Sequence, residues 1–324
     1  MKVNGGASMK VLRRLALRLA QAIPVILVVA VLSFFLMHLL PGDPAAVIAG
    51  PEAGAEAVER IRRQLGLDRS IPEQLLVWLW HLAQGDFGTS IIHNQSVLTA
   101  LADRLPVTIS LTLVAFVMTI PIGIVLGVAA AKFRNTWVDS AVMFLALVGV
   151  SVPGFWIAIL SVILFSVTLG WLPASGYVPL SVGVWPWLKA LLQPAAMLAL
   201  FQIGYLARMA RSATLDVLDQ DYIRTARAKG VSEWRTIAKH AFRNTLIPVV
   251  TTTGIILSLL MGGSVVIEQV FALPGVGRLI VQAILTRDYP LVQGTLLALA
   301  FLFVGINLLI DIIYTWVDPR VRYG

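Results

Sequence analysis

Six long apolar stretches alternate with polar segments along the chain. They cover residues 22–40, 107–131, 140–169, 190–207, 246–267 and 291–310. None of the six contains Asp, Glu, Lys or Arg. About 20 apolar residues in a helix cross the roughly 30 Å hydrocarbon layer of a bilayer, and a helix satisfies its own backbone hydrogen bonds there. The pattern therefore predicts an all-α integral membrane protein with six transmembrane helices, kinked at Pro24, Pro121 and Pro153.

The composition of the 324 residues agrees with this interpretation. Hydrophobic residues make up 58%, charged residues 13%, and the mean hydropathy is +0.85, whereas a soluble domain carries roughly 25% charged residues. These values exclude a soluble enzyme, a disordered tail and a nucleic-acid-binding domain, although the isoelectric point is about 10.1. The chain has no cysteine and only four widely spaced histidines, so the sequence predicts neither a disulfide nor a metal site.

Lys and Arg residues collect in alternate connecting segments. Of the 25, 17 fall in the N-terminal segment, in the segments after the second and fourth apolar stretches, and in the C-terminal tail. Cytoplasmic loops carry the excess of basic residues, so both termini are predicted to be cytoplasmic. The first stretch could instead belong to a signal peptide. It is longer than the usual apolar region of about 7–15 residues, and we interpret it as a retained anchor.

This topology divides the chain into five parts. They are a cytoplasmic N-terminal segment (1–21), the first transmembrane helix (22–40), an extracytoplasmic loop (41–106), a five-helix transmembrane core (107–317) that contains a cytoplasmic loop (208–245), and a cytoplasmic tail (318–324). In the outer loop, residues 71–84 predict a helix opened by Pro72. Trp78 and Trp80 favour an interfacial position at the membrane surface. This loop is either a structural cap or part of a docking surface for an extracytoplasmic partner.

The cytoplasmic loop predicts two helices with a break between them. Asp219 and Asp221 favour a helix start, Gly230 fits a left-handed C-terminal stop, and Ser232 can cap a second helix. That second helix is amphipathic, with an apolar face and a basic face. The faces consist of Trp234, Ile237, Ala238, Ala241 and Phe242, and of Arg235, Lys239 and Arg243. Such a helix could lie on anionic lipid, or both helices could form a rigid projection that docks on a soluble subunit.

The ten residues 221–230, Asp-Tyr-Ile-Arg-Thr-Ala-Arg-Ala-Lys-Gly, resemble the EAA loop of ABC importer permeases, and more narrowly that of the dipeptide, oligopeptide, nickel and glutathione permeases. Further stretches similar to these permeases lie at residues 38–44, 65–68, 84–90, 271–278, 287–290 and 318–322. The resemblance implies a coupling helix that contacts an ATP-binding subunit. Its contact residues would be Arg224, Thr225, Ala226, Ala228, Gly230 and Val231. Arg224 stands where the family's general pattern has glutamate, so no carboxylate role transfers to it.

The chain has no GxxxxGK[S/T] phosphate-binding loop, so it is predicted not to bind ATP in the Walker manner and not to be an enzyme. The resemblance implies two separate ATP-binding subunits that hold ATP and Mg, a second homologous permease subunit and an extracytoplasmic substrate-binding protein. This chain itself would carry no cofactor. Its remaining partner would be membrane lipid, with no nucleic acid. The implied cargo is a short peptide (a dipeptide, an oligopeptide or glutathione), with a nickel complex as the alternative within the family.

Only weakly polar groups can line a path through the charge-free stretches. Candidates for this translocation path are Ser151, Gln202, Thr252, Ser258 and Asn307. Each could instead serve its own helix, because Ser and Thr commonly bond to helix carbonyls. Glu268 and Asp311 lie at the ends of stretches, where surface groups are expected rather than proton carriers. A secondary transporter or channel without ATP-binding subunits is the competing class, and the lack of charges within the stretches argues against it.

Overall fold

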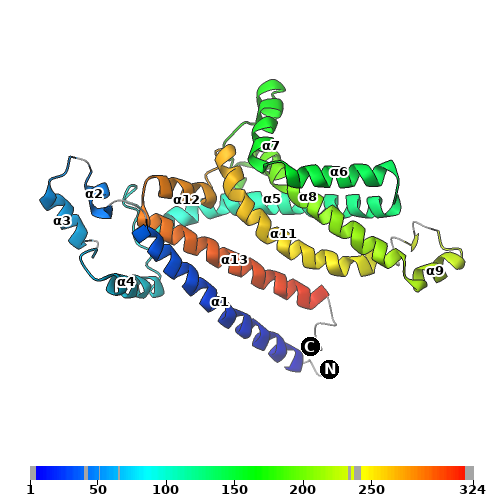
Figure 1. Ribbon diagram of the computed structural model, residues 1–324, viewed down its shortest axis with the longest axis horizontal. Helices are drawn as coiled ribbons and strands as arrows, with labels where there is room; N and C mark the ends of the chain where they lie inside the picture. Colours follow the sequence, from blue (N-terminus) through cyan, green and yellow to red (C-terminus); the bar gives the residue numbers. More distant parts are fainter. Residues whose placement is uncertain are drawn as a thin grey trace. The chain divides into compact units, whose positions relative to one another are not determined.

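The structure, a computed structural model, describes residues 5–39, 43–50, 52–64, 66–232, 235–236 and 242–317. These residues are almost entirely helical (Figure 1). The elements are α1 (Gly5–Leu39), α2 (Pro44–Ala49), α3 (Ala55–Gln64), α4 (Ile71–Ala83), α5 (Val97–Lys132), α6 (Trp137–Ser151), α7 (Gly154–Ser161), the π-helix η1 (Val162–Thr168), the 3-10 helix η2 (Leu180–Val182), α8 (Val184–Leu218), α9 (Asp221–Ala228), α11 (Phe242–Val270), α12 (Val276–Leu285) and α13 (Tyr289–Val317). No strand occurs in the described part of the chain. The predicted all-helical class is confirmed.

The chain divides into two compact units. The first unit comprises residues 1–106 and 278–308, and the second comprises residues 107–277 and 309–324. Helices α1 to α4 belong to the first unit, and α6 to α11 belong to the second. Helices α5, α12 and α13 run from one unit into the other.

Four helices are long and apolar enough to cross a membrane. These spans are Val97–Lys132, Val184–Leu218, Pro248–Val270 and Tyr289–Ile310. A bent pair, formed by α6 with α7 and η1, would be a fifth span, and the apolar part of α1, Ala20–Leu36, is shorter. Helices therefore occur at each of the six predicted stretches. By length and composition, four or five of them qualify as membrane-crossing among the residues described.

The third apolar stretch is broken, contrary to the prediction of one helix over residues 140–169. Helices α6 and α7 are bent by 102° relative to each other. Val152 has φ −98° and ψ 133°, the extended conformation that a residue before proline prefers. Pro153 thus ends one helix and precedes the next, which is a stronger effect than the predicted kink. Helices α1 and α5, by contrast, continue through Pro24 and Pro121.

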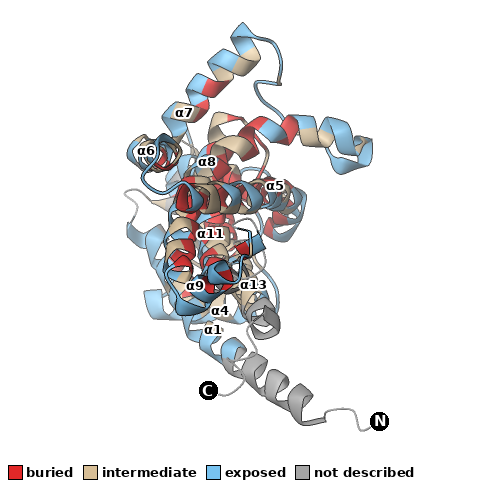
Figure 2. Ribbon diagram, turned by 90° about the vertical axis from the view of Figure 1, so that its right-hand side faces the viewer, coloured by how far each residue is buried: buried red, intermediate tan, exposed pale blue. Residues whose placement is uncertain are grey.

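Helix α8 is central to the second unit. Helices α6, α7 and α11 pack against it, and its apolar residues enter the main core cluster. These residues are Leu191, Ala195, Leu198, Ala199, Leu206 and Ala210. Figure 2 shows buried residues on α8, α11 and α5, whereas α4 and α1 are mostly exposed. Burial in the second unit therefore follows α8 along most of its length.

Glycine permits the closest approaches to α8. A Cβ on Gly127 of α5 would lie 2.5 Å from the carbonyl oxygen of Ala207 and 2.6 Å from the Cβ of Ala210. A Cβ on Gly204 of α8 would lie 2.9 Å from the Cα of Ala146 on α6. Small residues at these positions let the helix backbones come together, as is typical of membrane helix pairs. The inner packing of the second unit therefore depends in part on the absence of side chains at Gly127 and Gly204.

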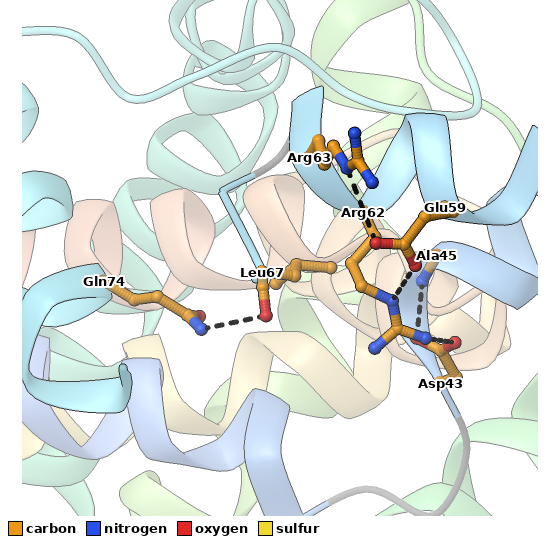
Figure 3. A network of polar contacts seen from close by, with 7 residues as sticks. All are labelled: Asp43, Ala45, Glu59, Arg62, Arg63, Leu67 and Gln74. Carbon is orange, nitrogen blue, oxygen red and sulfur yellow. Dashed lines mark hydrogen bonds and ion pairs between the residues drawn. The ribbon is translucent and has the colours of Figure 1, made fainter. Parts of the chain in front are cut away.

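In the first unit, the segment that follows α1 has its own polar network (Figure 3). The Asp43 carboxylate caps α2 by accepting a backbone N–H bond, and it also accepts a 2.5 Å bond from Nη2 of Arg62 on α3. Nε of Arg62 lies 3.3 Å from a carboxylate oxygen of Glu59. Gln74 of α4 donates to the carbonyl oxygen of Leu67 at 3.4 Å. The network links α2 to α3 and the α3–α4 turn to α4, so this segment is folded.

Asp288 anchors the beginning of α13, also within the first unit. Its carboxylate accepts the backbone N–H of Leu291, at the third residue of the helix, and thereby caps it. The same carboxylate accepts the hydroxyl of Ser90 and the N–H groups of Ile91 and Ile92. One buried carboxylate thus ties the segment before α5 to the start of α13.

Replacing Gly127 with alanine is expected to destabilise the detergent-solubilised chain by about 2 kcal/mol, as overpacking against a rigid neighbour does. The added methyl group meets the Ala207 carbonyl unless α5 or α8 moves. Gly262→Ala is the matched control, because a Cβ on this helical glycine has no atom within 4 Å. Intrinsic fluorescence during heating should give a lower midpoint for Gly127→Ala alone. Equal midpoints for the two variants would contradict a rigid α5–α8 contact.

Candidate functional site

Helix α9 follows α8 after a two-residue turn and begins at Asp221. Gln220 before it is extended, with φ −75° and ψ 148°. Asp221 places a carboxylate in the first turn, where the helix dipole favours negative charge. The predicted helix start is confirmed.

Gly230 ends α9 in the left-handed conformation, with φ +77°. Its N–H donates to the carbonyl of Arg227 at 2.9 Å, and the N–H of Val231 donates to the carbonyl of Ala226 at 3.2 Å. These two bonds make a Schellman motif, which satisfies carbonyls left open at a helix end. The predicted glycine stop is confirmed, and it sets the direction in which the chain leaves α9.

One face of α9 is docked on its own chain. Ile223 is 0% exposed and forms a cluster with Leu218 and Val217 of α8 and Val128 of α5. Ala226 lies on the same buried face, one turn further along. Burial of this face fixes α9 to the ends of two long helices, so α9 is positioned without any partner.

The other face of α9 is exposed. It carries Tyr222, Arg224, Thr225 and Ala228. The guanidinium of Arg224 lies 3.5 Å from the Asp221 carboxylate, and the hydroxyl of Thr225 donates to the Asp221 carbonyl at 2.9 Å. The residues predicted to contact an ATP-binding subunit are therefore divided: Ala226 faces inward in this chain, while Arg224, Thr225 and Ala228 face outward.

The predicted second helix of this loop lies largely outside the described residues. Only Arg235 and Thr236 are described between residues 233 and 241. The N–H of Thr236 donates to the carbonyl of Ser232 at 2.9 Å, as at the start of a helix. The apolar and basic faces expected for this helix stay predictions.

The five candidates for the translocation path lie on four helices. Ser151 ends α6, Gln202 lies on α8, Thr252 and Ser258 lie on α11, and Asn307 lies on α13. The first four belong to the second unit, where α6 and α11 both pack on α8. Four of the five side chains donate to a carbonyl four residues earlier, at 2.9 Å for Ser151, Thr252 and Asn307 and at 3.5 Å for Ser258. These groups thus serve their own helices, and their contact with cargo stays a prediction.

Glu268 is buried, contrary to the prediction of a surface group. Its side chain is 0% exposed, and Oε1 accepts the hydroxyl of Thr108 at 2.6 Å. Thr108 in turn accepts the N–H of Val276 at 2.9 Å. A Cβ on Gly275 would lie 2.3 Å from the Glu268 carboxyl carbon. The turn after α11 therefore folds back over Glu268. The position of Glu268 at the end of an apolar stretch does not reveal this tertiary contact. The Asp311 side chain lies outside the described residues.

Gln193 of α8 is a second buried polar group that the sequence did not single out. Its Oε1 accepts the hydroxyl of Ser166 at 2.9 Å, and its Nε2 donates to Ser161 at 3.1 Å. Because the serines lie on η1 and α7, the amide ties both segments to α8. This role depends on the packing of the broken third stretch on α8, which the sequence pattern does not show. Within the described ranges, no three His, Asp or Glu side chains gather closely enough to hold a metal ion.

The long apolar helices and the docked α9 define the chain's class as a multi-pass membrane permease. A family model described as "Binding-protein-dependent transport system inner membrane component" matches residues 123–323, and its N-terminal counterpart matches residues 11–112. The chain belongs to this family of bacterial inner-membrane transport components. Members are the non-catalytic permeases of ABC importers, which work with ATPase and substrate-binding partners. The resemblance carried by residues 221–230 is confirmed at the level of the family.

Two curated relatives match nearly the whole chain. A protein of Brucella abortus, provisionally named a peptide transport system permease protein, is 64% identical over 94% of this chain and 98% of its own length. The glutathione transport system permease protein GsiC of Salmonella typhimurium is 44% identical over 94% of this chain and 97% of its own length. Among solved structures, the inward-facing MetNI methionine ABC transporter is similar with a TM-score of 0.56 and 20% identity. That match covers 68% of this chain and 97% of the other and establishes similarity of fold.

Ile223→Ala is expected to undock α9, because the change empties a buried position between α8 and α5 and removes about 2–5 kcal/mol of packing. Limited trypsin digestion of the solubilised chain should then cut faster within residues 224–229. Thr225→Ala, on the exposed face, is the matched control and should leave the cutting rate unchanged. Equal rates for both variants would contradict the docking of α9 through Ile223.

Proposed function

We propose that this chain is one half of the translocation path of an ATP-driven importer of short peptides. Its relatives at 64% and 44% identity, named for peptide and for glutathione transport, support this cargo class. The complete importer contains a second homologous permease subunit, two ATP-binding subunits and an extracytoplasmic substrate-binding protein. ATP and Mg belong to the ATP-binding subunits, and membrane lipid surrounds the permeases. This proposal rests chiefly on the identity with both relatives across 94% of the chain.

Helix α9 is the coupling element of this proposal. Its exposed Arg224, Thr225 and Ala228 face the ATP-binding subunit, and Gly230 and Val231 complete the contact at its end. Ala226 supports the helix from its buried side. Movement of an ATP-binding subunit then displaces α9 together with α8 and α5, to which Ile223 is docked. Alternating access needs such rigid-body displacement of packed helices.

The chain crosses the membrane six times in this proposal, with both termini in the cytoplasm. Residues 1–21 and 318–324 are cytoplasmic, 22–40 form the first span, 41–106 form the outer loop, and 107–317 form the permease core with its cytoplasmic loop at 208–245. The apolar part of α1 and the bent α6–α7 pair supply the two spans beyond the four helices that are both long and apolar enough to cross a membrane. The distribution of Lys and Arg supports this orientation.

The outer loop lies against the membrane surface through α4. Trp78 contacts Phe34 of α1, with ring centroids 5.8 Å apart. Leu76 and Trp80 point away from this contact and are 67% and 66% exposed. An apolar helix face with tryptophan is favourable at the level of the lipid headgroups.

Ser151, Gln202, Thr252, Ser258 and Asn307 offer the polar lining of the path. Their hydroxyl and amide oxygens keep acceptor capacity when the donor side bonds to a helix carbonyl. A lining without charges suits the uncharged backbone that peptides share. Selection among peptides then lies with the substrate-binding protein.

Co-expression with the neighbouring transport genes, purification through a tag on this chain and reconstitution in liposomes test the proposed function. Two ATP-binding subunits should copurify, and ATP should drive uptake of a labelled dipeptide or of glutathione only when the binding protein is present. Uptake of a nickel complex alone would replace the peptide cargo. Uptake by this chain without any ATPase would overturn the proposal.

Gly230→Val is expected to uncouple ATP hydrolysis from uptake. A β-branched residue is strained at φ +77° and disrupts the Schellman motif, so the orientation of α9 changes. Uptake per ATP hydrolysed should fall by about tenfold, within the usual range of coupling between two sites. Gly230→Asn is the matched control, since asparagine tolerates this backbone conformation, and it should keep most of the uptake. Equal coupling ratios in the two variants would contradict the role of the glycine stop.

A further inference from the structure

Asp139 and Arg211 form a two-point ion pair between α6 and α8. Nε of Arg211 donates to Oδ1 of Asp139 at 2.6 Å, and Nη2 donates to Oδ2 at 2.7 Å. The Asp139 side chain is 8% exposed and that of Arg211 is 24% exposed. Paired bonds of this kind fix the orientation of both groups as well as their distance. The ion pair therefore sets how α6 is turned against α8.

The carboxylate also holds the turn between α5 and α6. The N–H of Asn135 donates to Oδ2 of Asp139 at 3.1 Å, and Asn135 is left-handed, with φ +63°. Asp139 lies in the first turn of α6, where a negative charge is favourable. One carboxylate thus joins three elements: the turn, the start of α6 and the side of α8.

Arg211 is close to α9 along the chain. It precedes the end of α8 by seven residues, roughly 10 Å of helix. On the same part of α8, Gly127 of α5 approaches Ala207 and Ala210, and Ala207 forms a cluster with Ala130 and Val142. The end of α8, about two turns further on, holds Leu218, which packs on Ile223 of α9. These contacts join α5, α6, α8 and α9 at one end of the second unit, and the ion pair is the polar contact that binds α6 to α8 in that group.

We propose that Asp139 and Arg211 are positioning residues for energy coupling: they make α6 move with α8 when the ATP-binding subunit displaces α9. This inference rests on the proposed function of α9. The desolvation cost of a buried ion pair argues that Asp139 and Arg211 orient α6 against α8 rather than merely stabilise the fold. Removing two charges from water offsets much of their attraction, so a buried ion pair adds little net stability compared with apolar residues of similar size. In some proteins such a pair instead fixes the register between two helices.

The experiment uses the reconstituted importer with four variants of this chain. Asp139→Asn and Arg211→Lys each remove the two-point geometry. The double variant Asp139→Leu with Arg211→Met keeps volume and removes both charges. Asp216→Asn is the matched control, because Asp216 is an exposed carboxylate on α8, the helix that carries Arg211. Three quantities are measured for each: copurified ATP-binding subunit, ATP hydrolysis with and without binding protein, and uptake.

Asp139→Asn, Arg211→Lys and the apolar double variant should all assemble and, without binding protein, hydrolyse ATP close to the wild-type level. Their uptake per ATP should fall by about tenfold, and the binding protein should no longer stimulate hydrolysis. Asp216→Asn should behave as wild type. An unchanged uptake per ATP in Asp139→Asn and Arg211→Lys would overturn the inference. Wild-type coupling in the apolar double variant would also overturn it, because the two residues would then serve packing alone. A wild-type chain that fails to copurify with an ATPase would overturn the proposed function instead, so the two failures are distinguishable.

Discussion

Helices in lipid gain no hydrophobic free energy by meeting one another, so their association depends on close packing and on polar contacts. In the second unit this constraint is met around α8. At Gly127, the α5 backbone lies so close to the Ala207 carbonyl of α8 that no Cβ fits between them. At Gly204, the α8 backbone lies similarly close to Ala146 of α6. Gln193 binds the serines of α7 and η1, and Arg211 binds Asp139. The arrangement of the other helices around α8, and with it the position of α9, follows from these few contacts.

The elements of this fold could be predicted from periodicity and length, but their junctions could not. Uncharged runs of about 20 residues have one stable backbone conformation in lipid, and a helix occurs at each of them. The break at Pro153 was only partly foreseen. Proline also lies within α1 and α5, where Pro24 and Pro121 leave the helix continuous. Val152 before Pro153 is extended, whereas the residues before Pro24 and Pro121 are helical, and the apolar pattern is the same at all three prolines.

The candidate coupling site shows the same division. Gly230 was predictable because a left-handed stop has a local cause, the lack of a Cβ. Which face of α9 is buried has a distant cause: Ile223 meets Val128, nearly a hundred residues earlier in the chain. The resemblance places Ala226 among the contact residues, whereas its side chain lies on the buried face of α9. The prediction that Glu268 is a surface group was wrong for a similar reason. The turn at Gly275 and Val276 covers its side chain in the folded chain, and the sequence pattern does not show this contact.

The distribution of polar groups separates the parts of this permease that must stay rigid from those that must be permissive. Its strongest buried polar contacts, at Asp139 with Arg211 and at Glu268 with Thr108, join helices to one another. Four of the five candidate path residues instead bond within their own helices, as Thr252 and Asn307 do. A hydroxyl or amide that donates to its own helix carries no net charge, and it offers a passing solute no rigid set of hydrogen-bond donors such as a guanidinium provides. Strong directional bonding is thus placed where helices must move together, and weak bonding is left where cargo is proposed to pass. Under the proposed function, the chain transmits displacement through its helix contacts and leaves selection of the substrate to a separate protein.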